Sequence, residues 1–108
     1  MNNEIIILST VPDIKEGETL ASILVEGNFA ACVNIIPKIT SIYQWNDKVH
    51  RDSEVLLLIK TNNINESQVY NIIKDKHSYD TPEIITLDLK NIDKKYAKWL
   101  NSTVNEKT

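Results

Sequence analysis

The alternation of apolar and polar residues predicts four strands in this chain. Residues 5–8 form a short, continuously apolar and mostly β-branched run, which is typical of a strand central in a sheet. Residues 30–45 and 49–61 resemble two long strands, and Asn46-Asp47 between them is a favourable hairpin turn because both residues tolerate positive φ. Residues 82–89 predict the fourth strand.

Apolar residues at helical spacing predict three helices. Asp13 followed by Glu16 signals the start of the first helix, and Gly27 signals its end. Asn65 followed by Gln68 signals the start of the second. The inward-facing residues are predicted to be Leu20, Ala21, Leu24 and Val25 in the first helix, Val69, Ile72 and Ile73 in the second, and Tyr96, Trp99, Leu100 and Val104 in the last.

The resulting order is βαββαβ followed by a terminal helix. This order predicts an α+β, ferredoxin-like fold, with a four-stranded antiparallel sheet and two helices packed on one face. A chain of 108 residues is near the commonest size of one domain, so we expect a single domain over residues 1–108.

The long second strand has a drier face and a more polar one. Its odd-numbered positions, from Ala31 to Trp45, are the more apolar set, and its even-numbered positions include Cys32, Asn34 and Gln44. Pro37 lacks an N–H and therefore predicts a bulge or an edge position. Across the hairpin turn, we expect His50 to pair with Tyr43.

The length of the hairpin predicts an oligomer. A compact domain of this size is about 35 Å across, whereas a strand over residues 30–45 extends for about 50 Å. Two helices of about 22 Å cannot cover such a hairpin, so its far end would leave Ile39, Ile42, Tyr43 and Trp45 exposed beside unpaired edges. Bending at Pro37 would shorten the reach. The alternative that we favour is a partner subunit with closed cyclic symmetry.

Composition and charge indicate which kinds of partner the protein binds and in which cellular compartment it is found. The net charge of −3 and the single arginine, Arg51, argue against nucleic-acid binding. No apolar run approaches the roughly 20 residues that span a bilayer, and the first residues do not resemble a signal peptide, so we expect no membrane partner. One cysteine cannot form an internal disulfide, which favours a reducing compartment and a cytoplasmic location.

An ordered set of short motifs resembles the CutA family, named for divalent-cation tolerance, over nearly the whole chain. The matching features are Thr10-x-Pro12, Leu20-Ala21, Leu24-Val25, Ala30-Ala31-Cys32-Val33-Asn34, Pro37, Ser41-x-Tyr43-x-Trp45, Glu54, Lys60-Thr61, His77-x-Tyr79-x-x-Pro82-Glu83 and Tyr96-x-x-Trp99. The resemblance implies a homotrimer whose long hairpins pair between subunits, and binding of a divalent metal, copper in particular. Trimers of PII signalling proteins are similar in architecture, which leaves a small-ligand sensor or a trimeric scaffold as the alternative.

Cys32 and His77 are the first candidates for metal ligands. A thiolate and an imidazole suit copper or zinc. A free cysteine in a strand is more often a small buried hydrophobe, and a histidine at a helix end often interacts with the last carbonyl groups.

The resemblance implies certain metal-binding residues in copper-binding relatives, and this sequence differs from them at two places. Ser9 stands where a cysteine is expected, and Lys76-His77 stands where a histidine pair is expected. A hydroxyl is a poor ligand for a soft metal, and an ammonium group repels a cation. We therefore expect weak metal binding, or a site that uses Glu83 or Cys32.

The remaining candidates form a cleft or interface set of Tyr43, Trp45, Glu54, Lys60 and Tyr79. With Glu83, they would hold a small anion, a metal-bound water or a partner peptide, whereas the simpler interpretation is a satisfied interface network. No nucleophile with a neighbouring base, and no phosphate-binding glycine loop, is recognisable in the sequence. We therefore expect a protein that is not an enzyme.

Overall fold

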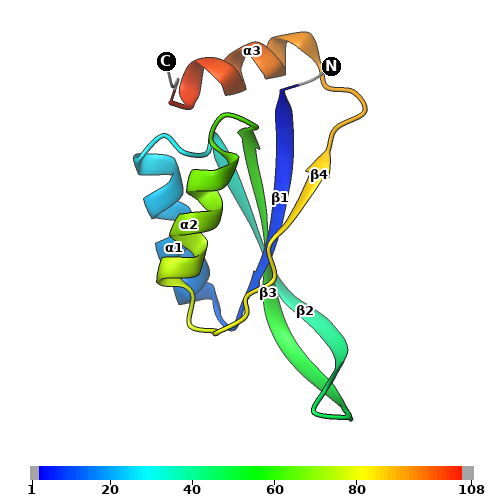
Figure 1. Ribbon diagram of the computed structural model, residues 1–108. Helices are drawn as coiled ribbons and strands as arrows, with labels where there is room; N and C mark the ends of the chain where they lie inside the picture. The colour runs from blue at the N-terminus through cyan, green and yellow to red at the C-terminus, as the bar shows by residue number, and fades with distance from the viewer. Residues whose placement is uncertain (1–2, 106–108) are drawn as a thin grey trace.

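A computed structural model describes residues 3–105 of the chain (Figure 1). It confirms the predicted order of elements. In chain order they are β1 (Glu4–Val11), α1 (Ile14–Glu26), β2 (Cys32–Trp45), β3 (Lys48–Asn62), α2 (Glu66–Lys76), β4 (Ile85–Asp88) and α3 (Lys94–Thr103).

The four strands form one antiparallel sheet in the order β2-β3-β1-β4. This is the ferredoxin-like arrangement that the sequence predicted. Helices α1 and α2 lie side by side on one face of the sheet, and α3 crosses one end of it (Figure 1). The strands at the two edges, β2 and β4, each have one side without a strand neighbour among the described residues.

The core lies between the sheet and the two helices α1 and α2. Leu57 and Ile59 from β3, Ile7 from β1, Leu24 from α1 and Ile73 from α2 have no exposed surface. Because side chains alternate along a strand, residues 6, 8 and 10 of β1 and residues 56, 58 and 60 of β3 point to the other face. That face is covered by neither α1 nor α2, and we call it the open face (Figure 1).

Local hydrogen bonds explain where the first helix begins and ends. The side chain of Asp13 accepts a hydrogen bond from the backbone N–H of Glu16 over 2.8 Å, as the sequence predicted. Gly27 ends the helix, and its N–H donates to the carbonyl oxygen of Ile23. Asn65 precedes α2 without capping it through its side chain, so that part of the start signal is not realised.

A chain of asparagines joins the N-terminal strand to the last helix. The side chain of Asn65 donates instead to Asn62 and to the backbone carbonyl of Asn105. Asn62 donates to Asn101, and Asn101 donates to the carboxylate of Glu4 over 2.7 Å. Both ends of the described chain are therefore fixed at the same end of the sheet, beside α3.

A bulge in β2 changes which side chains face which way. The pairing of β2 with β3 shifts register between Ile36 and Ile39, and Lys38 has a φ of 60°. Ile36 pairs with Leu56 and Ile39 pairs with Glu54, so β2 carries one extra residue here. The bulge lies at Pro37, as the sequence predicted, and the odd positions remain the less exposed set, but they do not all point to one face of the sheet. Before the bulge the even positions belong to the open face, and after it the odd positions do.

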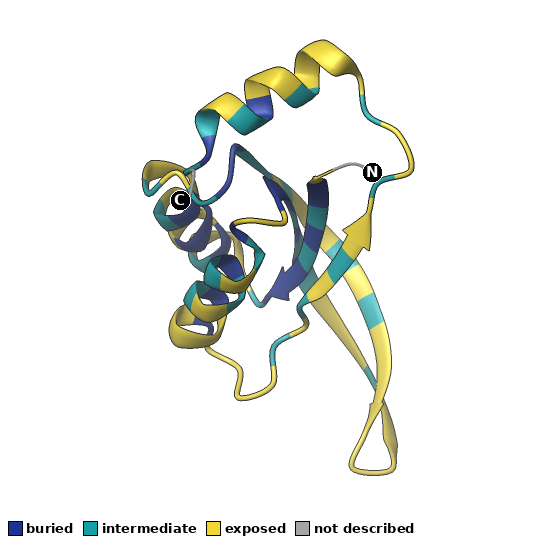
Figure 2. Ribbon diagram, turned by 45° about the horizontal axis from the view of Figure 1, so that its top comes forward, coloured by how far each residue is buried: buried dark blue, intermediate teal, exposed yellow. Residues whose placement is uncertain are grey.

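The β2–β3 hairpin projects beyond the rest of the molecule. Its turn, Asn46-Asp47, has φ values of 53° and 60°, as the sequence predicted. β1 pairs with residues 55–62 of β3, so residues 48–54 extend past it. The molecule measures 44 × 26 × 22 Å, and the hairpin is exposed almost throughout (Figure 2). Trp45 is 64% exposed and Val49 69% exposed in this protomer.

The last strand and last helix differ in part from their predictions. β4 covers only Ile85–Asp88, because residues 82–84, which were predicted to begin the strand, are not part of the sheet. In α3, Leu100 is buried, as is Val104 just after the helix, whereas Tyr96 and Trp99 are exposed and pack ring against ring. Among residues 3–105, the helices are all too short or too polar to cross a bilayer.

Candidate functional site

A groove of about 760 Å³ lies between the hairpin and the loop that follows α2. The hairpin contributes aromatic and acidic side chains, β1 contributes Thr10, and the loop contributes residues 79–81 and 83. The lining residues are Thr10, Ser41, Ile42, Tyr43, Trp45, Glu54, Tyr79, Asp80, Thr81 and Glu83. Five of the predicted site residues, Tyr43, Trp45, Glu54, Tyr79 and Glu83, therefore meet here.

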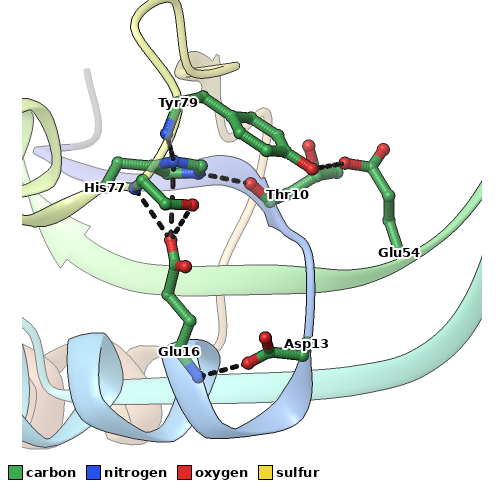
Figure 3. Close-up of polar contacts among 7 residues, drawn as sticks. Thr10, Asp13, Glu16, Glu54, His77 and Tyr79 are labelled. Atoms are coloured by element: carbon green, nitrogen blue, oxygen red, sulfur yellow. Dashed lines mark hydrogen bonds and ion pairs between the residues drawn. The ribbon is translucent and has the colours of Figure 1, made fainter.

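His77 forms the base of the loop that carries Tyr79 (Figure 3). Its side chain has no exposed surface. Nε2 lies 2.7 Å from the carbonyl oxygen of Thr10, and Nδ1 lies 3.0 Å from the backbone nitrogen of Tyr79. The imidazole thus joins the end of α2 to the end of β1 and shapes the first turn of the loop.

The partners of His77 fix its tautomer. A backbone carbonyl can only accept, so Nε2 carries the hydrogen, and a backbone N–H can only donate, so Nδ1 is the acceptor. Both nitrogens are therefore engaged, and neither has a free lone pair for a metal in this arrangement. The carboxylate of Glu16 lies 3.5 Å from Nδ1, but it forms an ion pair only with a protonated ring. Its better contacts are with the backbone N–H and the hydroxyl of Ser78, each at 3.1 Å.

Tyr79 reaches from this loop to the hairpin. Its hydroxyl donates to the carboxylate of Glu54 over 3.0 Å, and its ring lies against that of His77 with 4.7 Å between centroids (Figure 3). Partial burial, followed by the hydrogen bond to Glu54, raises the pKa of Tyr79 to about 12. The phenol is therefore neutral at physiological pH and acts as a hydrogen-bond donor.

Tyr43, on the hairpin itself, is held in the same way as Tyr79, by a carboxylate at its hydroxyl. Its hydroxyl donates to Asp52, and this hydrogen bond is the main cause that raises the pKa of Tyr43. Its ring stacks on that of His50, with centroids 5.4 Å apart and planes 18° apart. The predicted pairing of Tyr43 with His50 across the hairpin is confirmed by the strand register.

Cys32 and Lys60 lie on the same open face as Thr10 and Glu54, but toward the end of the sheet that α3 crosses. They pair with each other in the β2–β3 register, and Lys60 also pairs with Ile6 of β1. Ile6 is four residues from Thr10, whose carbonyl oxygen is hydrogen-bonded to His77. Cys32 is therefore displaced from Thr10 by about 13 Å along the strands. Within one protomer the structure therefore does not bring Cys32 and His77 together. Lys60 instead places its ammonium group 5.8 Å from the centre of the Tyr96 ring.

Sequence reasoning missed four residues that line the groove or hold neighbouring side chains in place. Asp80 and Thr10 line it, Asp52 fixes Tyr43, and Glu16 fixes Ser78. Asp52 could have been found from the register of the hairpin. It lies two residues from His50, the partner of Tyr43, and therefore on the same face of the sheet. Nothing in the sequence pairs Glu16 with a residue 62 positions later. Among residues 3–105, no group of three or more histidine, cysteine or acidic side chains is arranged to hold a metal ion.

Comparison with known families gives a match over most of the chain. Residues 5–103 match the family described as CutA1 divalent ion tolerance protein. The chain is 37% identical over 103 residues to the divalent-cation tolerance protein CutA of Yersinia pestis, covering 95% of this chain and 87% of that protein. It is 40% identical over 102 residues to the chloroplastic protein CutA 1 of rice, covering 94% of this chain. The matched part spans 58% of the rice protein's length.

Solved structures show the same fold. The divalent cation tolerance protein Cut A1 of Thermus thermophilus superposes with a TM-score of 0.92 at 39% identity, covering 94% of this chain and 99% of that one. Rice CutA1 superposes with a TM-score of 0.93, also at 39% identity, covering 96% of this chain and 95% of that one.

Proposed function

This chain belongs to the CutA1 divalent ion tolerance family, and on that premise we propose that it acts in divalent-cation tolerance as a homotrimer that binds divalent metal weakly. Copper is the metal that we would test first, as the resemblance implies. We propose no catalytic role. We place the protein in the cytoplasm, because its only cysteine is free.

The observation that best supports self-association is the apolar open face. Ile85 and Leu87 of β4 are 47% and 44% exposed, and they pair with Leu8 and Ile6 of β1. On the other side of β3, Ile36 of β2 is exposed as well. A face of this kind is normally buried against another layer. A second copy of the chain would supply that layer.

The free edges of the sheet favour a ring over a dimer. The unpaired edges belong to different strands, β2 on one side and β4 on the other. A contact between two different surfaces is heterologous, and it closes into a ring when the rotation between copies allows it. Three copies joined in this way would turn their open faces inward and give each projecting hairpin a neighbour.

Weak metal binding is supported by the charge of the groove. The charged residues that line it, Glu54, Asp80 and Glu83, are all acidic. Acidic side chains attract a divalent cation, but carboxylates alone are poor selectors of copper, which prefers imidazole and thiolate ligands. His77 would have to release one of its two backbone partners to serve as a ligand. We therefore propose that Glu83 contributes to a low-affinity site and that His77 and Cys32 are weaker candidates.

Calorimetric titration with Cu(II) and Zn(II) tests the metal part of this proposal. We expect weak binding that Glu83→Gln reduces and that Glu26→Gln, an acidic change on the exposed side of α1, leaves unaltered. His77→Ala and Cys32→Ser identify any contribution from those side chains. Heats equal to dilution into buffer would remove the metal part. Native mass spectrometry of the same samples gives the number of subunits, and a monomer at micromolar concentration would remove the assembly.

The second candidate function is a small-ligand sensor, and the groove favours it. Its volume is within the range of about 300–1,000 Å³ that is usual for small-molecule sites. Aromatic rings and a few polar groups form its lining, as in many such sites. A small anion is the less favourable occupant, because Lys60 does not line the groove and the charged residues of the lining are acidic.

A further inference from the structure

The carboxylates of the groove lack a positive partner in a single copy of the chain. Glu54, Asp80 and Glu83 line the groove, and among the described residues no basic side chain lines it. Glu54 accepts a hydrogen bond from the hydroxyl of Tyr79, whereas the side chains of Asp80 and Glu83 form no hydrogen bond or ion pair within residues 3–105. Unpaired charges are costly to remove from water. An assembly that turns this groove inward therefore needs a positive group to fill it.

Lys48 presents a positive charge near the hairpin turn. It is the first residue of β3, is exposed, and pairs with Trp45, which lines the groove. Even-numbered positions of β3 share one face, so Lys48 points to the open face, as Glu54 does. In the described part of the chain, Lys48 has no ion pair. The same face of each copy thus carries an acidic groove and a separate, unpaired ammonium group.

This ammonium group cannot reach the carboxylates of its own copy. Lys48 and Glu54 are six residues apart on one strand, which separates them by about 20 Å. A lysine side chain is far shorter than this distance. The groove of one copy and the end of the hairpin of another are different surfaces, and a contact between different surfaces closes into a ring when the rotation between copies allows it. The two free edges of the sheet favour the same kind of contact.

The other basic residues nearby fit the groove less well. Arg51 also lies on the projecting part of β3, but it pairs with Ile42 at an odd-numbered position, so it points to the opposite face. Lys60 is on the open face, but its ammonium group lies 5.8 Å from the centre of the Tyr96 ring, toward α3. Lys48 therefore combines a position on the open face with a place on the hairpin that projects beyond the rest of the molecule (Figure 1).

We propose that a neighbouring copy of the chain fills the groove, and that the partner subunit's Lys48 places its ammonium group against the carboxylates of Glu83 and Asp80. The inference rests on the proposed homotrimer and names the residue that each copy contributes to the next. It leaves the small-ligand alternative without an open groove. An ammonium group in this position also competes with a metal ion for Glu83, which is consistent with weak metal binding.

Charge-reversal variants test this pairing through the rate of subunit exchange. Unlabelled and isotope-labelled protein are mixed, and native mass spectrometry follows the appearance of mixed trimers. We expect Lys48→Glu and Glu83→Lys each to speed exchange at least about tenfold, because each change places like charges together. The variant that carries both changes restores a pair of opposite charges and should exchange at close to the wild-type rate.

Arg51→Glu is the matched control, because it changes the net charge by the same amount on the opposite face of the hairpin. It should leave the exchange rate unaltered. Lys48→Met removes the charge and retains most of the length of the side chain, so it should speed exchange by less than Lys48→Glu does. Circular dichroism checks that each variant is folded, which we expect because Lys48, Arg51 and Glu83 are exposed.

Three results would overturn the inference while the trimer stands. The first is an unchanged exchange rate for Lys48→Glu. The second is equal acceleration by Lys48→Glu and Arg51→Glu, which would show an effect of net charge alone. The third is a double variant that exchanges as fast as the single variants, which would show that Lys48 and Glu83 do not meet. A wild-type monomer in the same spectra would instead remove the proposed homotrimer, and the inference with it.

Discussion

His77 donates a hydrogen bond from Nε2 to the carbonyl oxygen of Thr10, 67 residues earlier in the chain. The bond crosses from the end of α2 to the end of β1 and is buried. With the bond from the Tyr79 N–H to Nδ1, it makes the imidazole a bridge between the core and the wall of the groove. A residue that the sequence offered as a metal ligand is, in this protomer, a structural support.

Replacing His77 should therefore cost stability whether or not metal is present. His77→Ala leaves the Thr10 carbonyl and the Tyr79 N–H without their partners, and an unsatisfied buried group costs about 1–3 kcal/mol. We expect a loss in the free energy of unfolding of at least about 2 kcal/mol by urea denaturation at fixed protein concentration. His50→Ala, on the exposed hairpin, is the matched control and should lose less. Equal losses would show that the buried bridge contributes nothing.

Lys38 holds the bulge of β2 in a backbone conformation that suits glycine. A non-glycine residue in the left-handed region costs about 1–2 kcal/mol, and Lys38 has a φ of 60°. Lys38→Gly should therefore raise the free energy of unfolding by about 0.5–1 kcal/mol after the greater flexibility of glycine in the unfolded chain is subtracted. Thr40→Gly, two residues along in regular pairing with Ser53, should lower it. If Lys38→Gly lowered the free energy of unfolding as much as Thr40→Gly does, the backbone at Lys38 would not be strained.

The raised pKa of Tyr79 makes stability fall at high pH. The phenol titrates at about 12 in the folded protein and near 10 when unfolded. The folded state therefore favours the neutral form, and this contribution is complete below pH 10 and is lost as the pH rises from about 10 to about 12. Tyrosinate absorbance measures the ionisation. We expect Tyr79→Phe to remove a late transition and Tyr96→Phe to leave it in place, while Glu54→Gln should move it to lower pH.

Trp45 should matter for assembly and little for the protomer. It is 64% exposed in the isolated chain, so its removal opens no cavity there. If a neighbouring copy buries it, Trp45→Ala should weaken the trimer by about 3–5 kcal/mol, the cost of truncating a buried tryptophan. Analytical ultracentrifugation across a dilution series gives this value, with Gln44→Ala as control. An unchanged mass and an unchanged melting temperature would place Trp45 outside the interface.

Local signals predicted most of the fold. Asp13, Glu16 and Gly27 bound α1 as expected, and Asn46-Asp47 forms the hairpin turn, because capping and turn chemistry depend on neighbours in sequence. The switch of faces at Lys38 could not be counted from alternation, since one added residue inverts every later position.

The periodicity of α3 shows a second limit of local signals. It identifies one apolar face that includes Tyr96 and Trp99, but it does not reveal whether the same chain covers that face. The groove could not be predicted from local signals, because contacts between residues far apart in the sequence form it. Tyr79 and Glu54 are 25 positions apart, and Glu16 and Ser78 are 62 apart, distances at which spacing carries no information.

The asparagine chain from Glu4 through Asn101 and Asn62 to Asn65 and Asn105 holds both ends of the described polypeptide beside α3, while the hairpin points the opposite way (Figure 1). An affinity handle or a fluorescent fusion partner joined to the described chain beside α3 would thus lie at the opposite end of the molecule from the hairpin turn. A sensor surface could be coated with tethered protein through such a handle, and the hairpin turn would face the flowing solution.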